Sequence, residues 1–329
     1  MIKRTRVLVT GVGSGTGQAI LTALQQNKHR YRIFVSDCDE YAAGLYLTKN
    51  RFVIPKLESE IGIESLMRVI NKMDIDVVLP GNEFDVLELS KKKTEIERAS
   101  KAKVIVSNLE TISITNDKWL TYKYLEKSGV SIPRTVLVED HINVPDVSNH
   151  ITFPWIVKPR LGTASKGVNL VNSVDEALEV ISRTPGALIQ EFLQSSVKFE
   201  DKNLEYTCGV FSDADGKLHG PIVAERILKN GTSWIVRVVT DIEVSNYVLQ
   251  VASKFNFVGP FNVQLIKTQK GPKILEVNCR FSGTTGIRSY FGFNEPKMAI
   301  NNFVRGNQIR VKNLNQGLVL RYVENIVVK

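Results

Sequence analysis

One stretch of the chain constrains its fold more than any other and reads FNVQLIKTQKGPKILEVNCR. Two apolar runs separated by a turn with Gly and Pro are typical of a β-hairpin. Glu276, Asn278 and Arg280 are two residues apart, so on a strand their side chains share one face. A turn centred on Lys270 places Gln264 opposite Glu276 on the partner strand. One face of the hairpin then presents two amide oxygens, a carboxylate and a guanidinium.

This set of side chains suits a metal ion and an anion. Three oxygen ligands on one face are what a hard cation such as Mg²⁺ prefers, with water and phosphate oxygens as its other ligands. Arg280, one step further along, can hold a phosphoryl or carboxylate group through two hydrogen bonds. The alternative is a strand end whose polar side chains face solvent, and this pattern alone does not exclude it.

Composition narrows the class of protein. With 329 residues the chain can form two or three domains, and 43% hydrophobic and 23% charged residues are ordinary for a globular protein. A net charge of +9 suits an anionic ligand such as a nucleotide. No aromatic–basic patch predicts a nucleic-acid partner, and no long apolar run predicts a membrane span. Three widely spaced cysteines suggest neither a disulfide framework nor a metal site, so we expect a cytoplasmic protein.

The first hundred residues predict a Rossmann-like α/β domain. A buried strand at 6–10, a glycine-rich turn at 11–17, a helix and a strand at 31–36 form a βαβ unit. The turn is similar to the fingerprint of short-chain dehydrogenases, and Asp37 stands at the ribose-binding distance. An NAD(P)-dependent reductase is therefore one alternative. That family also needs a Tyr-x-x-x-Lys pair, and no tyrosine of this chain is followed by lysine four residues on.

Polar residues follow the apolar strand at 75–79. Asn82, Glu83 and Asp85 come just past its carboxyl end, where open α/β sheets bind ligands, so these side chains can contact a substrate. The alternative is that Asn82 and Asp85 only cap the next helix.

The middle of the chain carries a lysine and a loop of small residues. Lys158 lies inside an apolar strand, where an unpaired lysine is seldom buried. Residues 160–167 follow it and can fold over phosphates through their N–H groups. The loop is not a P-loop, because it lacks Gly-Lys-Ser/Thr and joins two strands. A second segment at 229–233 is also expected to be flexible.

Six motifs occur in one order between residues 105 and 300. They are Asp-Lys on a helix, Gly-Val-x-x-Pro, Val-Lys-Pro, the small-residue loop, Gln-Glu-Phe, and Asn-Val-Gln with Glu-x-Asn-x-Arg. Their order resembles the ATP-grasp superfamily, most of all a single module of the carbamoyl-phosphate synthase large subunit and related carboxylate–amine ligases. The resemblance implies an α/β fold: a Rossmann-like domain at 1–108, a small ATP-grasp subdomain at 109–184 and a C-terminal subdomain at 185–329.

The resemblance also implies three sets of site residues. The ATP-binding set is Lys118, Lys158, Gly162, Ser165, Gly167, Gln190, Glu191, Phe192, Leu193 and Glu205. The metal set is Gln264, Glu276 and Asn278, for Mg²⁺ or for Mn²⁺ in its place. The catalytic set is Arg280 and Lys158.

Each set has an implied role. Lys118 and Lys158 would bind phosphates under the loop, residues 190–193 would lie beside adenine, and Glu205 would hold the ribose. Arg280 would contact the transferring phosphate. Lys118 as an exposed helix residue and Glu205 as an ordinary strand residue remain alternatives. With one formal charge on the metal face, a second Mg²⁺ would depend on the phosphates of the nucleotide.

The predicted function is that of an ATP- and Mg²⁺-dependent ligase that joins a carboxylate to an amine. It would act through an acyl phosphate and release ADP and phosphate. Its partners would be small-molecule carboxylates and amines, and a homodimer is compatible with this class. Two alternatives stay open, the nicotinamide-dependent reductase and a nucleotide-binding module without turnover. The sequence does not name the substrates.

Overall fold

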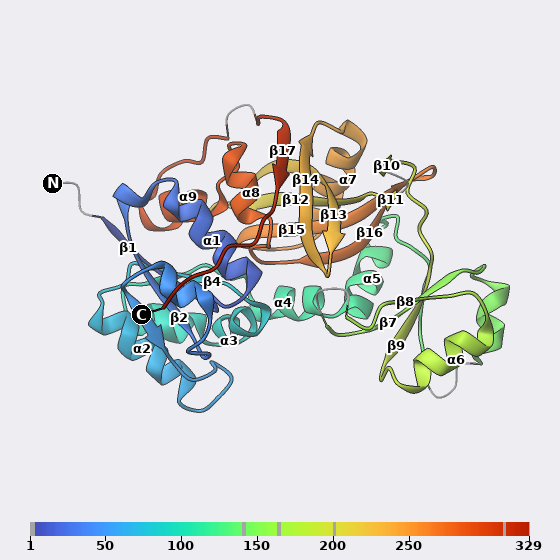
Figure 1. Cartoon of the computed structure of the whole chain (residues 1–329), viewed down its shortest axis with the longest axis horizontal. Helices are drawn as coiled ribbons and strands as arrows, with labels where there is room; N and C mark the ends of the chain where they lie inside the picture. Colours follow the sequence, from blue (N-terminus) through green and yellow to red (C-terminus); the bar gives the residue numbers. More distant parts are fainter. Residues whose placement is uncertain (1–3, 140–142, 163–165, 200–201, 312–313, 329) are drawn as a thin grey trace.

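A computed structural model describes residues 4–139, 143–162, 166–199, 202–311 and 314–328. Its described part contains a five-stranded parallel sheet, antiparallel sheets of six and of four strands, and a two-stranded antiparallel pair. The three main sheets can be followed in Figure 1. The parallel sheet and its helices lie at one end of the molecule, and the small antiparallel sheet with its helix lies at the other. The largest sheet lies between them along the upper side of the view. The predicted α/β class and its Rossmann-like first domain are confirmed.

The parallel sheet has the strand order β3-β2-β1-β4-β5. Its strands are β1 (Thr5–Thr10), β2 (Tyr31–Asp37), β3 (Arg51–Val53), β4 (Val77–Pro80) and β5 (Lys103–Val104). The helices of this domain are α1 (Gly15–Gln25), α2 (Gly62–Lys72) and α3 (Glu83–Ala99). The inner residues of the central strand β1 are apolar and fully buried, with Val7, Leu8 and Val9 at 0% exposure. This follows because helices cover both faces of a parallel sheet. The strand order reverses between β1 and β4, which is where such sheets bind ligands.

The small sheet has four antiparallel strands in the order β6-β9-β7-β8. They are β6 (Thr135–Leu137), β7 (Trp155–Pro159), β8 (Asn169–Val171) and β9 (Ala187–Glu191), and α6 (Val174–Ser182) packs against β7 and β8. Trp155 is fully buried in the core between helix and sheet. Because β9 pairs with both β6 and β7, the predicted division after residue 184 falls inside this sheet, and the sheet ends at Glu191.

The large sheet has six antiparallel strands in the order β16-β15-β12-β13-β14-β17. They are β12 (Glu205–Ser212), β13 (Leu218–Lys229), β14 (Thr232–Val239), β15 (Gly259–Thr268), β16 (Gly271–Asn278) and β17 (Gly317–Leu320). Helix α7 (Ile242–Ala252) packs on this sheet, and α4 (Leu109–Asn116) and α5 (Lys118–Lys127) lie beside it. Tyr122 of α5 donates a hydrogen bond to the carbonyl of Leu275 at 2.7 Å, which ties that helix to β16.

The predicted hairpin is confirmed as β15 and β16. Gln264 lies opposite Glu276, and Asn262 lies opposite Asn278, so all four side chains share one face. The register shifts by one residue next to Gln264. Arg280 follows the end of β16 and is not part of the strand.

The prediction of a flexible segment at 229–233 is wrong. Strands β13 and β14 continue to a tight turn in which Asn230 and Gly231 both have positive φ, at 50° and 71°. An Asn-Gly pair adopts this conformation readily, and it matches the twist of the two flanking strands. The tip of this hairpin is therefore ordinary β structure.

The last third of the chain returns to the first helix. Helices α8 (Thr285–Tyr290) and α9 (Glu295–Ala299) pack against α1 (Figure 1). The side chain of Gln26 donates to Ser289 Oγ at 2.6 Å, and Asn294 Nδ2 donates to the carbonyl of Ala23 at 2.9 Å. The parallel sheet and the six-stranded sheet are thereby joined into one packed unit.

Short elements complete the described structure. They are β10 (Lys198–Phe199), β11 (Lys202–Asn203), the single turns η1 (Lys28–Arg30), η2 (Ala43–Leu47) and η3 (Val144–Asn149), and the π-turn η4 (Ile300–Val304). Each described helix is too short or too polar to cross a bilayer.

Candidate active site

A cavity of about 260 Å³ lies between the small and the large antiparallel sheets. Predicted site residues from six separate segments line it: Lys118, Lys158, Gly162, Gln190, Glu191, Phe192, Leu193, Glu205, Gln264 and Glu276. Gly167, Asn278 and Arg280 are described but do not line this cavity, and Ser165 lies outside the described residues. The fold therefore brings together most of a set that spans more than 150 positions of sequence.

Lys158 of β7 is buried, and two of its three N–H donors are hydrogen-bonded within the protein. Its Nζ donates to the hydroxyl of Tyr122 at 2.7 Å and to Oε1 of Gln190 at 2.8 Å. Burial lowers the pKa of Lys158 to about 8, and the Glu276 carboxylate opposes that shift. Lys158 therefore lines the cavity as a lysine whose pKa, at about 8, lies close to neutral pH.

Lys118 stands at the first position of α5. Its Nζ donates to the carbonyl of Gly162 at 2.6 Å, and its backbone N–H donates to the carbonyl of Arg160. Burial lowers the pKa of Lys118, while Glu276 raises it and Lys158 lowers it. Because Asp117 caps α5 and also accepts from Arg160 at 2.7 Å, the start of the small-residue loop is fixed to this helix.

The strand β9 contributes two side chains of opposite orientation. The amide of Gln190 is held at both ends, since Nε2 donates to Thr135 Oγ1 at 2.8 Å and Oε1 accepts from Lys158. Gln190 is 2% exposed, so its side chain orients Lys158. Glu191 accepts from the backbone N–H of Arg134 at 3.0 Å. Apolar side chains complete the walls beside this strand: Ile156, Val168, Leu193, Ile266 and Leu275.

Arg226 of β13 was not predicted from the sequence, yet it lies in the same cavity. Its Nη2 donates to Glu205 Oε2 at 2.8 Å and to Gln264 Oε1 at 2.7 Å. A register shift between Gly209 and Phe211 pairs Glu205 with Arg226. Counting back from the hairpin turn without this bulge would pair Glu205 with Glu225, a like-charge pair. Cross-strand pairing with an allowance for a bulge is the signal that could have found Arg226.

Glu276 is the carboxylate of the predicted metal face. It interacts electrostatically with both Lys118 and Lys158. Among the described residues, no group of three or more His, Cys, Asp or Glu side chains could hold a metal ion. The donor set of one carboxylate and two amide oxygens is the oxygen-only chemistry that Mg²⁺ accepts, provided that phosphate oxygens supply further charge. By donor type the residues fit Mg²⁺ together with a polyphosphate, with Gln264 and Glu276 at the cavity and Asn278 outside its lining.

Asn278 and Arg280 lie beyond the cavity, toward the parallel sheet. Asn278 is 5% exposed at the end of β16. Arg280 Nη2 is 3.9 Å from Oε2 of Glu83, and its Nη1 donates to the carbonyl of Phe281. Its buried Nε has no hydrogen-bond partner among the described residues. Arg280 therefore joins the hairpin to the N-terminal domain, and its Nε donor is unused.

The residues after β4 have a structural role as well. Asn82 Oδ1 accepts from the N–H of Asp85 at 2.7 Å and caps α3. The capping alternative is thus confirmed for Asn82. Glu83, the first residue of the helix, points its carboxylate toward Arg280.

The glycine-rich turn is filled by groups of the protein itself. A Cβ on Gly11 would lie 2.0 Å from Nδ2 of Asn82, and one on Gly17 would lie 2.5 Å from the carbonyl oxygen of Gly11. The N–H of Gly13 donates to Asp37 Oδ2 at 2.7 Å. One N–H of the turn is thus already bonded to a carboxylate, and the space beside Gly11 and Gly17 is taken by the protein itself.

Comparison with known proteins agrees with this geometry. A family model described as an ATP-grasp domain matches residues 115–284, more than half of the chain, and a model described as a PylC-like N-terminal domain matches residues 7–105. A carbamoyl-phosphate synthase of Methanobrevibacter smithii is 25% identical over 165 residues, which cover 49% of this chain and 43% of that protein. The chain thus spans less than half of that relative's length.

Two further comparisons cover more of the chain. A probable alpha-L-glutamate ligase of Marinobacter nauticus is 26% identical over 245 residues, 69% of this chain and 76% of that protein. The structure of N5-carboxyaminoimidazole synthetase from Staphylococcus aureus, complexed with ADP, aligns with a TM-score of 0.76 at 16% identity, over 98% of this chain and 84% of that one. From the match of its sequence over residues 115–284, and with a fold that agrees, the chain belongs to the ATP-grasp family.

Proposed function

We propose that the chain is an ATP-dependent ligase that activates a carboxylate as an acyl phosphate and transfers the acyl group to an amine. The observation that carries the proposal is the meeting of Lys118, Lys158 and Glu276 in one cavity with the apolar walls and the strand β9. A nucleotide with a bound metal ion needs positive charge for its phosphates, a carboxylate for the metal and an apolar pocket for its base. The two lysines, Glu276 and the apolar walls provide these three features.

Charge neutralisation is the main task of such a site. Phosphoryl transfer needs positioning and electrostatic stabilisation more than covalent protein chemistry. Lys118 and Lys158 are already desolvated, so each would interact strongly with phosphate oxygens. The hydrogen bonds from Lys158 to Tyr122 and Gln190 set its direction before any ligand arrives.

The metal ligands in this proposal are Gln264, Glu276 and Asn278. A bound Mg²⁺ would neutralise β- and γ-phosphate oxygens. Arg226 orients Gln264 by its hydrogen bond to Oε1, and Glu205 balances the charge of that guanidinium. In this arrangement Glu205 has a second role besides contact with the ribose.

The carboxylate substrate would enter on the side of Arg280. The unpartnered Nε of Arg280 is a buried donor that an anionic substrate would satisfy. Glu83 lies across from it on the first turn of α3, so the N-terminal domain would form the opposite wall. Attack by the carboxylate on the γ-phosphate would give an acyl phosphate and ADP, and attack by the amine would then release phosphate.

The partners in this proposal are a small-molecule carboxylate and a small-molecule amine, acting in the cytoplasm. Names of similar proteins support a ligase that uses ATP, since a glutamate ligase and a carbamoyl-phosphate synthase are among them. A homodimer and the replacement of Mg²⁺ by Mn²⁺ remain predictions.

Product analysis tests the proposal directly. The chain is incubated with ATP, Mg²⁺ and pooled amino acids and dicarboxylic acids, with and without hydroxylamine. We expect ADP and orthophosphate in equal amounts, and a hydroxamate that forms only when the true carboxylate is present. AMP and pyrophosphate in stoichiometric amounts would overturn both the mechanism and the role of Arg280.

Matched variants separate the site from background hydrolysis. Lys158→Met removes the buried cation at the cavity, whereas Lys92→Met removes an exposed lysine of α3 that pairs only with Glu95 at 2.8 Å. We expect ADP formation to be lost in the first variant and retained in the second. Equal rates in both variants would show that the observed turnover does not come from this cavity.

A further inference from the structure

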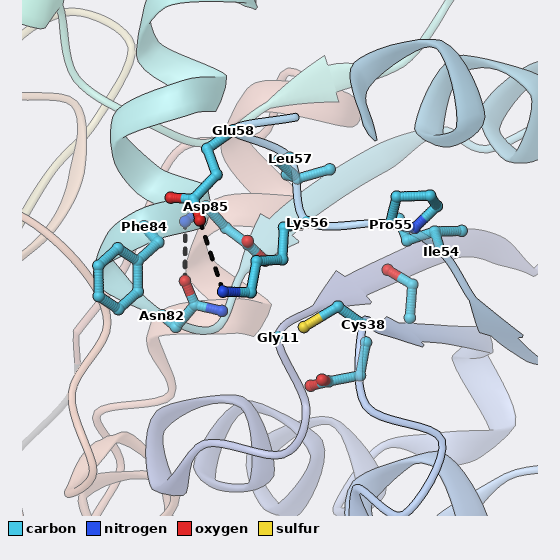
Figure 2. Close-up of a pocket in the computed structure, with 12 residues that line it drawn as sticks. Gly11, Cys38, Ile54, Pro55, Lys56, Leu57, Glu58, Asn82, Phe84 and Asp85 are labelled. Carbon is cyan, nitrogen blue, oxygen red and sulfur yellow. Dashed lines mark hydrogen bonds and ion pairs between the residues drawn. The ribbon is translucent and has the colours of Figure 1, made fainter. Parts of the chain in front are cut away.

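A second cavity, of about 280 Å³, lies at the carboxyl edge of the parallel sheet. It is lined by residues that follow four neighbouring strands: Gly11 after β1, Ser36, Asp37 and Cys38 at the end of β2, the segment 54–58 after β3, and Asn82, Phe84 and Asp85 after β4. Figure 2 shows Lys56, Glu58, Asn82 and Asp85 close together on one side of the cavity and Cys38 on the other. This is the edge at which open α/β sheets bind small molecules.

The cavity lies outside the site proposed for ATP. The two cavities share no lining residue, and the first turn of α3 stands between this one and Arg280. Glu83 faces Arg280, whereas its neighbours Asn82 and Phe84 line the new cavity. The proposed ligase chemistry therefore leaves this space unexplained.

The charge in this cavity is opposite to that of the whole chain. The chain carries a net charge of +9, but the lining has three carboxylates, Asp37, Glu58 and Asp85, against the single ammonium of Lys56. Lys56 Nζ is 3.6 Å from Glu58 at the exposed rim, so these two groups largely balance each other. The inner part of the cavity is left with Asp37 and Asp85.

The protein supplies its own anions where a ligand anion would otherwise bind. Asp37 accepts from the N–H of Gly13 at the start of α1, and Asp85 lies in the first turn of α3. Helix N-termini attract anions, and here one carboxylate lies beside the turn that leads into α1 and another lies in the first turn of α3. Burial raises the pKa of Asp85 to about 6, although the neighbouring Thr10 and Asn82 side chains lower it. A cation in the cavity would relieve the cost of burying this carboxylate.

A buried hydroxyl points to a ligand independently of the carboxylates. Ser36 is 0% exposed and lines the cavity at the end of β2. Its Oγ has no hydrogen-bond partner among the described residues. A buried hydroxyl without a partner is costly, so a polar group that enters the cavity would satisfy it. Ile54, Leu57 and Phe84 supply apolar surface beside these polar groups.

We propose that this cavity binds the primary ammonium group of a small molecule, with Asp85 as the counter-charge, Ser36 as a hydrogen-bond acceptor and the apolar side chains as the site for a short carbon chain. This inference deepens the proposed function, whose amine substrate is of this class, and its role there rests on that function. Binding itself belongs to the N-terminal domain and needs neither ATP nor Mg²⁺. Its occupant is recognised by charge and by length of carbon chain.

Cys38 gives a direct readout of occupancy. It lines the cavity and is exposed, whereas Cys208 and Cys279 are buried and burial raises the pKa of both thiols to about 12. Iodoacetamide at about pH 8 should therefore modify Cys38 first, under conditions where aspartates are ionised and alkylamines are protonated. The probes are n-alkylamines from propylamine to hexylamine, each compared with the alcohol and the carboxylate of equal length. The rate of alkylation is followed by mass spectrometry.

We expect at least one amine to slow alkylation of Cys38 severalfold, while the alcohol and the carboxylate of the same length do not. Asp85→Asn and Ser36→Ala should each weaken this protection. Glu40→Gln should not, because Glu40 is exposed near Cys38 but does not line the cavity.

Two results would overturn the proposal. One is that no amine protects Cys38, or that alcohols or carboxylates protect it equally well. The other is that protection persists unchanged in both Asp85→Asn and Ser36→Ala. Because the assay contains no ATP, its outcome is independent of whether the chain proves to be a ligase.

Discussion

The Nη2 atom of Arg226 lies 2.7 Å from the Oε1 atom of Gln264. Gln264 is a predicted metal ligand, and its carbonyl oxygen has two lone pairs. With one lone pair held by the guanidinium, the other has a fixed direction toward the face shared with Glu276. Arg226 therefore acts on the metal site through the orientation of a neighbour, as groups behind metal ligands commonly do.

Arg226→Gln is expected to raise the Mg²⁺ concentration that gives half-maximal turnover by about tenfold or more. The reason is that Gln264 loses the group that orients it. Steady-state ATPase rates over a range of Mg²⁺ concentrations measure this change. Arg237→Gln is the matched control, since Arg237 pairs with Glu225 on the same sheet but is 48% exposed. An unchanged Mg²⁺ dependence in Arg226→Gln would argue against the role of Gln264 as a ligand.

Glu276→Gln is expected to reduce turnover by about a hundredfold or more, since it removes the carboxylate of the metal face. Binding of a fluorescent ATP analogue should stay measurable, because adenine would be held by residues of β9. Glu179→Gln on α6 is the control, at a side chain that is 73% exposed. A Glu276→Gln enzyme with a nearly normal rate in Mg²⁺ would contradict the metal assignment.

The pH dependence of kcat/KM should report Lys158. Its pKa is lowered by burial to about 8, and a lysine is charged below its pKa, so kcat/KM for ATP should fall as the pH rises through about 8. Lys158→Arg should abolish this fall, because arginine stays protonated. Lys92→Arg should leave the profile as it is. A flat wild-type profile up to about pH 9.5 would refute the assignment of Lys158 as a phosphate-binding cation.

The buried pair of Arg288 and Glu295 should dominate the stability of the C-terminal helices. Arg288 Nη1 is 3.0 Å from Glu295 Oε1, and the side chains are 1% and 0% exposed. Arg288→Gln leaves a buried carboxylate unpaired and should lower the free energy of unfolding by about 3–5 kcal/mol. Urea denaturation measures it. Arg183→Gln, in an exposed pair on α6, should change stability by only about 0.5 kcal/mol. Equal effects of the two variants would contradict this account.

The hairpin shows what local pattern can predict. Alternation around a turn centred on Lys270 placed Gln264 opposite Glu276. The structure reaches the same pairing through a turn between Thr268 and Gly271 and a one-residue register shift next to Gln264. The strand ends at Asn278, so the position of Arg280 does not follow from alternation. It depends on a contact with Glu83, nearly two hundred positions earlier, which only the packing of two domains determines.

Other features failed for identifiable reasons. Arg226 was missed because a one-residue bulge decides its partner, although Gly220 and Pro221, which lie within that bulge, are residue types that often mark one. The turn at Asn230 was misread as flexible, although an Asn-Gly pair between two apolar runs predicts a hairpin. The glycine-rich turn left open whether a ligand binds there, and in the structure Gly11 and Gly17 make room for Asn82 and for the backbone of residues 11–12.

The packing of α1 against the last helices has a consequence for synthesis of the chain. The carbonyl of Ala23 accepts from Asn294, which is 271 positions later. At the usual elongation rate of about 5–20 residues per second, roughly 15–55 seconds pass on the ribosome before Asn294 follows Ala23. During that interval the face of α1 that later packs against α8 and α9 is exposed. The nascent N-terminal domain therefore presents an aggregation-prone surface that a chaperone or the exit tunnel must shield.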